Sequence, residues 1–231
     1  MLQLKRQEEI MALLAEQREM TVKELCAALY TSPATIRRDL SELEQRGLLR
    51  RSFGGAVLTE CYTDQLPLQI RRAAHIAEKK RIALKAVRHI APGDTVFLDA
   101  SSTTYFLSEH LSKIPELTVI TNNPHLSTVL ASQQIRTLCT GGEMLHASVA
   151  LVGREAERFV GGFSANACFF SARGFAENEA SDSSKAERDI KIAMLERAKR
   201  HFFLCDSSKF GQQYAFRIGN AECFDEIIDE S

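Results

Sequence analysis

The sequence lacks the marks of a secreted, membrane-bound or metal-binding protein. Its N-terminus has no apolar segment ahead of a small-residue cleavage site, and no apolar run approaches the roughly 18 residues that span a bilayer. We therefore expect a cytoplasmic protein without membrane contact. The six cysteines form no Cys-x-x-Cys pair and have no histidines at metal-ligand spacing, so we expect reduced, mostly buried thiols and neither a metal nor another cofactor. These cysteines are Cys26, Cys61, Cys139, Cys168, Cys205 and Cys223.

A large charge of one sign is also missing, because 29 lysines and arginines nearly balance 30 aspartates and glutamates. The overall charge therefore gives no sign of nucleic-acid binding, and any such site must be a local cluster. One cluster lies between residues 37 and 51, where arginines outnumber acidic residues by five to three. The five arginines are Arg37, Arg38, Arg46, Arg50 and Arg51.

The length of 231 residues suits a small domain joined to a larger one. Hydrophobic residues make up 45% of the chain and charged residues 26%, which is ordinary for a folded protein, and no internal repeat is present. We divide the chain into a first domain (residues 1–58), a linker (residues 59–74) with no sustained period, and a second domain (residues 75–231).

Three helices are predicted in the first domain. Residues 3–17 carry apolar side chains at helical spacing. Thr21 and Glu24 can form a capping box, in which each side chain satisfies a backbone N–H of the other, so a second helix begins there. Ser32 is a typical N-cap and Pro33 suits the first helical position, so a third helix begins almost directly after the second.

The third helix, residues 33–46, has one apolar face and one open face. Ile36, Leu40 and Leu43 fall on the same side, whereas Arg38 lies opposite them. A tight turn between two helices, the second opening with hydroxyl residues and arginines, is typical of a helix-turn-helix that places its second helix in the major groove of DNA. We expect DNA contacts from Ser32, Thr35, Arg37 and Arg38.

Residues 48–57 predict a short hairpin around Gly54 and Gly55, which would form a wing beside the helix-turn-helix. Arg50 and Arg51 would then lie along the phosphate backbone of the DNA. Two alternatives stay open. A single arginine is more often a solvated surface charge, and some winged helices bind proteins instead of DNA.

The second domain alternates short apolar strands with helices, which predicts a mainly parallel sheet covered on both faces. The fold class is therefore α/β, with a winged helix-turn-helix joined to a larger α/β domain. The predicted strands are residues 95–99, 117–121, 135–140, 168–171, 202–205 and 226–229, and the predicted helices are residues 78–90, 103–112, 184–199 and one that begins near residue 124.

Small, polar or charged residues follow five of these strands. Because ligands bind beyond the carboxyl ends of parallel strands, we expect a pocket there. After the first strand, Asp99 and a run of hydroxyl residues lead into a helix N-terminus, a combination that suits a phosphate group. Each residue taken singly could instead be only a cap or a turn residue. The candidates are Asp99, Ser101, Ser102, Thr103, Thr104, Asn122, Gly141, Gly142, Arg173, Gly174, Asp206 and Lys209.

The helix-turn-helix resembles that of the DeoR family of bacterial regulators. The resemblance lies in residues 32–40 (Ser-Pro-Ala-Thr-Ile-Arg-Arg-Asp-Leu), residues 47–51 (Gly-Leu-Leu-Arg-Arg) and residues 53–56 (Phe-Gly-Gly-Ala). These segments occur together at the family's spacing. The chain departs from the family at Phe53, where histidine is usual, so the wing contact at that position is open.

The second domain follows the order of motifs in the effector domain of the same family, including residues 169–174 and residues 206–211. The resemblance implies a ribose-phosphate-isomerase-like fold, and it adds Gly153, Glu187 and Lys191 to the effector site. Glu187 and Lys191, four residues apart, could also form an ordinary surface ion pair. The chain departs from the family at Asn166, where aspartate is common, and at Ala100-Ser101, where a glycine is common. These departures could change which effector is bound.

The resemblance implies a DNA-binding transcription regulator of a carbohydrate-metabolism operon, a repressor more readily than an activator. Its partners would be double-stranded operator DNA and a small phosphorylated sugar, and a homo-oligomer would hold two winged helices on repeated half-sites. The rival interpretation is a sugar-phosphate isomerase or deaminase with an accessory winged helix. Such an enzyme needs an acid or base beside its substrate, and residues 171–174 supply none, although Asp99, Glu187 and Asp206 remain available. We therefore expect that the chain is not an enzyme.

Overall fold

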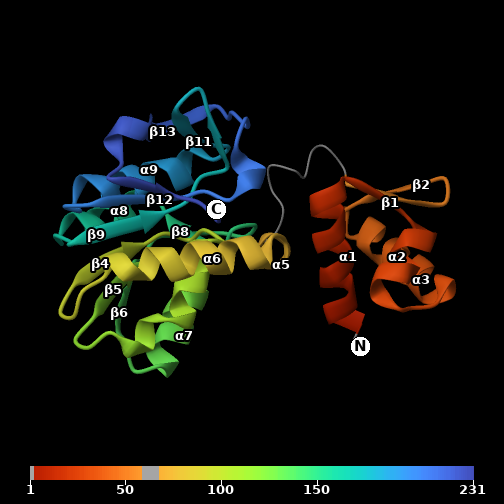
Figure 1. Cartoon of the computed structure of the whole chain (residues 1–231), viewed down its shortest axis with the longest axis horizontal. Coiled ribbons are helices and arrows are strands. Elements are labelled where there is room, and N and C mark those ends of the chain that lie inside the picture. Colours follow the sequence, from red (N-terminus) through yellow and green to blue (C-terminus); the bar gives the residue numbers. More distant parts are fainter. Residues whose placement is uncertain (1–2, 59–67) are drawn as a thin grey trace. The chain divides into compact units, whose positions relative to one another are not determined.

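The computed structural model describes residues 3–58 and 68–231, which belong to two compact units, Met1–Ile76 and Ala77–Ser231 (Figure 1). Within these residues no helix is long and apolar enough to cross a membrane. Cys61 lies outside the described residues, as does the first part of the expected linker.

The first unit contains the three helices that the sequence predicts. In order its elements are α1 (Gln3–Gln17), β1 (Glu19–Thr21), α2 (Val22–Leu29), α3 (Pro33–Gln45), β2 (Arg50–Ser52), β3 (Gly55–Val57) and α5 (Leu68–Ala73). The capping box of Thr21 and Glu24 is formed, and the Ser32 side chain accepts the backbone N–H of Thr35 at the start of α3. Ile36, Leu40 and Leu43 are buried together with residues of α1 and α2. The predicted helix-turn-helix is therefore confirmed.

The wing is a three-stranded antiparallel sheet in the order β1-β3-β2, and its third strand, β1, was not predicted. The turn also differs from the predicted one by one residue. Phe53 and Gly54 form it, with Gly54 at φ +85°, while Gly55 already belongs to β3. A Cβ atom on Gly55 would lie 2.2 Å from the Met20 carbonyl oxygen, so glycine is needed there because β1 approaches closely.

The end of the expected linker is helical. Leu68 and Ile70 of α5 are buried, and Ile70 belongs to the core of the first unit. The His75 backbone N–H donates a 3.1 Å hydrogen bond to the Glu16 side chain at the end of α1. α5 buries apolar side chains, so the end of the expected linker forms a helix that the sequence pattern did not predict.

The second unit is built on a six-stranded parallel sheet in the order β14-β12-β9-β4-β5-β6, which confirms the predicted α/β class. Two smaller antiparallel sheets, β10-β11-β13 and β7-β8, were not predicted. The strands are β4 (Thr95–Leu98), β5 (Thr118–Thr121), β6 (Arg136–Cys139), β7 (Glu143–Leu145), β8 (Ala150–Val152), β9 (Ala167–Phe170), β10 (Gly174–Ala176), β11 (Glu179–Asp182), β12 (His201–Leu204), β13 (Phe216–Asn220) and β14 (Glu226–Ile228).

Helices cover both faces of the parallel sheet. They are α6 (Ile76–Ala86), α7 (Pro124–Ser132), α8 (Arg154–Gly161) and α9 (Lys185–Glu196), with short 3-10 stretches η1 (Val87–His89), η2 (Thr104–Glu109), η3 (Leu111–Lys113), η4 (Ser207–Lys209) and η5 (Ala221–Cys223). Val96 and Leu98 of β4 lie in a cluster with α6 and α7, while Phe97 between them lies in a second cluster with α8 and α9. Successive side chains of a strand therefore enter opposite cores.

The predicted helix over residues 103–112 is wrong in type, because two 3-10 stretches replace it. Side chains compete there with the backbone: the Ser108 hydroxyl donates to the Tyr105 carbonyl oxygen, which an α-helix would use, and the Thr104 hydroxyl turns back toward Asp99 and Ser101 ahead of the predicted helix. The hydroxyl run after β4 therefore does not begin an α-helix with a full helix dipole.

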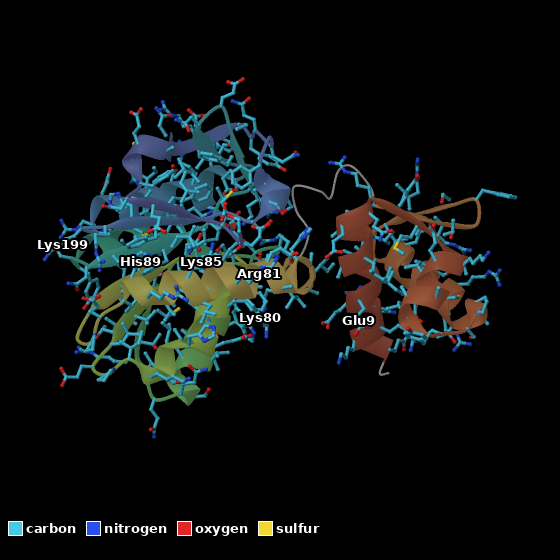
Figure 2. The ribbon with its side chains drawn as sticks, in the orientation of Figure 1. Glu9, Lys80, Arg81, Lys85, His89 and Lys199 are labelled. Carbon is cyan, nitrogen blue, oxygen red and sulfur yellow. The ribbon has the colours of Figure 1, made fainter. Side chains whose placement is uncertain are left out.

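Two ion pairs connect α6 to η2 and to the residues after β14. Figure 2 labels Lys80, Arg81, Lys85 and His89 along this helix and the η1 turn. The Lys80 ammonium lies 3.1 Å from a Glu109 carboxylate oxygen in η2. The Lys85 ammonium lies 3.7 Å from a carboxylate oxygen of Asp229, which follows β14. This helix is thereby held over the sheet at both the η2 side and the β14 side.

Candidate DNA interface and effector site

The open face of α3 presents the predicted DNA-contacting residues to solvent. Arg37 and Arg38 are exposed, and Thr35 is half-buried. The hydroxyl oxygens of Ser32 and Thr35 are 2.9 Å apart, so the two side chains hold each other at the start of the helix. A fixed N-cap beside two exposed guanidinium groups gives this end of α3 the donors that DNA phosphates and base edges accept.

The three acidic residues of the 37–51 cluster are bonded within the first unit. Asp39 is buried and accepts two hydrogen bonds from the Arg6 guanidinium of α1, at 2.5 and 3.1 Å. Glu42 accepts from two glutamine side chains of α1, and Glu44 accepts from the Arg51 backbone N–H at 2.8 Å. The acids that lower the charge of the cluster are therefore engaged by the protein itself.

The structure separates the five arginines of this cluster into two groups. Arg51 donates from its guanidinium to the Ser41 hydroxyl at 3.0 Å, and Arg46 donates to the Gln7 side chain at 3.3 Å. Arg37, Arg38 and Arg50 are exposed, and the side-chain hydrogen bonds and ion pairs found within residues 3–58 and 68–231 include none from their guanidinium groups. The sequence alone gave no means to distinguish the groups.

In the second unit, Asp99 lies at the carboxyl end of β4 and organises the loop that follows. One carboxylate oxygen accepts the Ser101 backbone N–H at 3.1 Å and the Thr104 hydroxyl at 3.0 Å. The other accepts the Ser171 backbone N–H, from the end of β9, at 3.3 Å and lies 3.7 Å from the Lys191 ammonium. Asp99 is fully buried, so its oxygens position the loop and do not face solvent.

Lys209 joins the ends of three neighbouring strands. Its ammonium donates to the Thr103 hydroxyl beyond β4 at 3.0 Å and to the Ser171 hydroxyl beyond β9 at 2.6 Å. It also lies 3.1 Å from a carboxylate oxygen of Asp206, which follows β12. The Lys209 side chain is not fully buried, so a positive charge and two hydroxyl groups meet at the rim of the sheet.

Asp206 is ionised in this setting. Burial alone would raise the pKa of its carboxyl group, but the charges of Lys209 and Lys79 and a hydrogen bond from the Ser208 hydroxyl hold that pKa well below its usual range. Lys79, a buried residue of α6, therefore belongs to the same electrostatic group, although the sequence gave no reason to select it.

Lys191 belongs to an internal charge network. It is buried on α9, pairs with Asp182 of β11 and lies near Asp99. Burial would lower the pKa of the Lys191 ammonium, but these carboxylates and that of Glu187 raise it. The Arg173 guanidinium lies 4.0 Å from Asp182. Lys191 and Arg173 thus lie against Asp182, a buried carboxylate that the sequence did not reveal because β11 was not predicted, and the charge of Glu187 acts on Lys191.

A second group of candidates lies beyond β5 and β6. The Asn122 side chain donates to the Leu151 carbonyl oxygen at 3.0 Å, but its own oxygen is buried and has no hydrogen-bond partner among the described residues. The Thr140 hydroxyl oxygen is also buried and has no hydrogen-bond partner among the described residues. Buried polar atoms are normally paired in proteins, so these two oxygens are candidate contacts for a bound ligand.

The remaining candidates shape the backbone around these groups. Gly142 has φ +116°, and a Cβ atom there would lie 2.4 Å from the Val152 carbonyl oxygen. A Cβ atom on Gly174 would lie 2.2 Å from the Gln212 carbonyl oxygen. Gly153 has φ +88° at the start of α8, Gly141 is exposed, and Ser102 is buried. Close backbone approach therefore explains the glycines at positions 142 and 174, and a positive φ explains the glycine at position 153.

Asn166 lies at the opposite end of the strands from this edge. Its side-chain oxygen accepts the Thr95 backbone N–H at 2.9 Å, at the amino ends of β9 and β4. Because the candidate site lies at the carboxyl ends of the same strands, the expectation that Asn166 alters the choice of effector is not supported by its position. Its role is to join two strands where they begin.

The five described cysteines are unpaired, but only Cys168 and Cys205 are buried, so the expectation of mostly buried thiols is wrong for these five. Burial raises the pKa of the Cys205 thiol to about 12. In the part of the chain that the structure describes, no group of three or more histidine, cysteine, aspartate or glutamate side chains could hold a metal ion.

Comparison with family models gives two matches along the chain. Residues 6–61 match the DeoR-like helix-turn-helix domain, and residues 74–231 match the DeoR C terminal sensor domain. Together they extend over most of the sequence, and the two matched segments fall on either side of residues 62–73.

Curated relatives align over nearly all of the chain. The HTH-type transcriptional regulator YulB of Bacillus subtilis is 34% identical, covering 100% of this chain and 90% of the relative. The glycerol-3-phosphate regulon repressor of Escherichia coli is 29% identical, covering 100% and 92%. The lactose phosphotransferase system repressor of Streptococcus mutans is 33% identical, covering 90% and 84%.

Solved structures resemble the α/β unit at low identity. The eIF2B delta subunit of Chaetomium thermophilum matches with a TM-score of 0.52 and 15% identity, covering 68% of this chain and 57% of that one. A D-ribose-5-phosphate isomerase in complex with phospho-erythronic acid matches with a TM-score of 0.43 and 14% identity, covering 57% and 52%. At 15% identity, the likeness to the eIF2B delta subunit shows a similar fold and nothing further.

Proposed function

Since this chain belongs to the DeoR family of DNA-binding transcription regulators, we propose that it represses a carbohydrate-metabolism operon and that a phosphorylated sugar relieves the repression. Two of its relatives are named as repressors, one of a glycerol-3-phosphate regulon and one of a lactose phosphotransferase system. The first name contains a phosphorylated polyol and the second a phosphotransferase system for a sugar, which supports this class of effector.

The DNA side of the proposal assigns α3 to the major groove. Arg38, on the open face, reads a base edge together with Thr35, while Ser32 and Arg37 hold phosphates. Arg50 adds a phosphate contact from the wing. Arg51 reaches the DNA only if its bond to the Ser41 hydroxyl is exchanged, so we assign it a smaller part.

The effector side depends on one observation, the meeting of the Lys209 ammonium with the Thr103 and Ser171 hydroxyls at the carboxyl edge of the parallel sheet. A phosphate oxygen can replace the hydroxyls as the acceptor of the ammonium, and the Thr103 hydroxyl can then donate to the same phosphate. The Ser171 hydroxyl can do so by exchanging its 2.5 Å hydrogen bond to the Leu204 carbonyl oxygen. The unpartnered oxygens of Asn122 and Thr140, beyond neighbouring strands, would accept hydroxyl groups of the sugar.

The same geometry argues against catalysis. A general base works best when its pKa lies near the operating pH. Lys209 and Lys79 hold the pKa of Asp206 low. Both carboxylate oxygens of Asp99 already accept hydrogen bonds from the loop after β4 and from the Ser171 N–H, and one of them lies near Lys191. We therefore propose that the α/β unit senses its ligand and does not convert it.

The proposal includes a homo-oligomer, because two half-sites on a duplex call for two copies of α3. Effector binding would change the spacing or rigidity of these two copies and so lower operator affinity. We place the protein in the cytoplasm, where a regulator meets the chromosome. We also place the DNA-binding part within residues 1–58 and the effector and oligomerisation part within residues 75–231.

The test combines thermal unfolding with a DNA mobility shift. The purified chain is heated with a panel of phosphorylated sugars and polyols, each beside its unphosphorylated counterpart as the matched control. A ligand at a hundred times its Kd stabilises the folded state by about 2.7 kcal/mol, so a phosphorylated compound should raise the melting temperature and release the DNA. Turnover of any compound, or equal stabilisation by the unphosphorylated partner, would contradict the proposal.

A further inference from the structure

Two aromatic side chains of the first unit are fully exposed, Tyr30 and Phe53. The other exposed large hydrophobic residues described, Ile76, Leu84, Met144 and Phe210, are only 42 to 49% exposed. A phenylalanine ring left in water forgoes the free energy of burying it, and Phe53 has no polar atom to compensate. Its position at the tip of the wing therefore points to a contact that the isolated chain does not make.

The backbone holds this ring outward. Gly54, the other turn residue, has φ +85°, and its carbonyl oxygen accepts the Val22 backbone N–H at 2.8 Å, at the start of α2. Gly55 packs against the Met20 backbone, and β3 pairs with strands on both sides. The tip is thus anchored to α2 and to β1, so Phe53 is presented at a fixed place beside the helix-turn-helix.

The neighbours of the ring indicate what it meets. Arg50, Arg51 and Ser52 of the adjoining strand are all exposed, so the ring lies next to cationic and hydroxyl side chains. A surface that combines positive charge with one projecting apolar wedge complements duplex DNA, where phosphates flank a stacked apolar interior. Because these arginines of the wing belong to the same unit as the exposed arginines of α3, duplex DNA is the partner that fits both sets.

We propose that Phe53 enters the minor groove, inserts between two base pairs and bends the duplex whose major groove α3 reads. The inference rests on the proposed DNA-binding function and adds a shape-reading contact to it. With α3 in the major groove, the adjacent groove within reach of a wing is the minor one, and apolar side chains inserted there unstack a base step. The cost of unstacking depends on the sequence, so Phe53 selects operators with a flexible step.

The experiment begins with a pool of random duplexes of about 40 base pairs, long enough for two half-sites, from which the wild-type chain selects its preferred sequence. Affinity for that duplex is measured by fluorescence anisotropy over a range of KCl concentrations. Phe53→Ala should weaken binding about tenfold at every salt concentration, because the lost contact is apolar and releases no counterions. Arg50→Ala should instead flatten the salt dependence by about one counterion.

Two further variants guard the interpretation. Leu84→Ala removes another exposed apolar side chain, from α6, and should leave DNA binding unchanged. Phe53→Leu keeps an apolar wedge and should recover most of the lost affinity. The bend is read from energy transfer between dyes at the duplex ends, and Phe53→Ala should straighten a duplex that the wild type bends by some tens of degrees.

Equal affinity of the wild type and Phe53→Ala would overturn the inference, as would weaker binding with an unchanged bend. A variant that binds DNA normally but sediments as a smaller species would assign the ring to a contact between copies of the chain, which also overturns it. Failure of the wild type to select or bind any duplex is a different result, because it would remove the DNA-binding function itself.

Discussion

The two units of this chain expose their functional residues in opposite ways. In the first unit, Arg37, Arg38 and Arg50 extend into solvent, and the acids around them are bonded elsewhere. In the second unit, Asp99 and Lys191 are buried and bonded to other candidates. A DNA site can thus be a surface on a rigid scaffold, whereas the proposed ligand site is part of the core. Substitutions should therefore act on binding in the first unit and on both stability and binding in the second.

The largest effect is expected from Lys191→Met. Removing the buried ammonium leaves Asp182 and Asp99 without their main counter-charge, which in comparable buried pairs costs about 3–5 kcal/mol. Denaturant unfolding of the full chain measures it. The matched control is Lys185→Met on the same helix, whose ion pair with Asp189 is exposed and should contribute less than about 1 kcal/mol. Similar losses in the two variants would erase the contrast between buried and exposed charges.

Lys209→Met should weaken the effector and spare DNA. Loss of a charge-assisted hydrogen bond costs about 1.5–3 kcal/mol, or roughly 10- to 150-fold in affinity for the phosphorylated compound found by the thermal screen. Because Asp206 also loses its partner, the variant should melt earlier, so affinity is measured directly by calorimetry. DNA mobility shifts should match those of the wild type. A folded variant that no longer binds DNA would contradict the assignment of DNA binding to the first unit and effector binding to the second.

Arg38→Ala should cost about 1–3 kcal/mol of operator affinity if the guanidinium reads a base. Its melting temperature should not change, because the side chain is exposed. The matched control is Arg46→Ala, near the end of the same helix, whose guanidinium already binds Gln7. If both variants retain full affinity for the selected duplex, the assignment of α3 as the reading helix is wrong.

The smallest effect concerns the capping box of α2. Hydrogen bonds from the Thr21 backbone and side chain lower the pKa of Glu24. A lowered pKa in the folded state means that the stabilisation is complete above the unfolded pKa of about 4.3 and is lost as pH falls through the folded value. Glu24→Gln should therefore unfold more easily than the wild type at neutral pH. At acid pH, where Glu24 is protonated, the two proteins should be equally stable. Unfolding curves between neutral and acid pH test this, with Glu8→Gln as an exposed control.

The features that the sequence predicted well are those decided by neighbours along the chain. Ser32 caps α3 and Pro33 opens it, because an N-cap depends on residues within one helical turn. The parallel sheet followed from apolar strands alternating with helices. The stretch after β4 was harder, since Thr104 and Ser108 bond to nearby carbonyl groups and favour 3-10 turns over the expected α-helix.

The features that the sequence did not reveal depend on residues far apart in it. The Lys191 ammonium lies 3.7 Å from an Asp99 carboxylate oxygen although 92 positions separate the two residues. Lys79 joins the Asp206 group although 127 positions separate them in the numbering. β1 was missed because three residues are too few to establish an alternating pattern, and only Gly55 gave a hint that another backbone approaches. A single sequence does not show which residues distant along the chain are in contact.

The pair of Arg6 and Asp39 has a practical consequence for anyone who redesigns the chain. Asp39 is the one acidic residue buried in α3, and its counter-ion comes from the opening helix of the sequence. A shortened version that begins after Arg6 would retain every proposed DNA-contacting residue yet leave a carboxylate uncompensated beneath them. Trimmed DNA-binding fragments should therefore keep α1 whole, or replace Asp39 with a neutral residue at the same time.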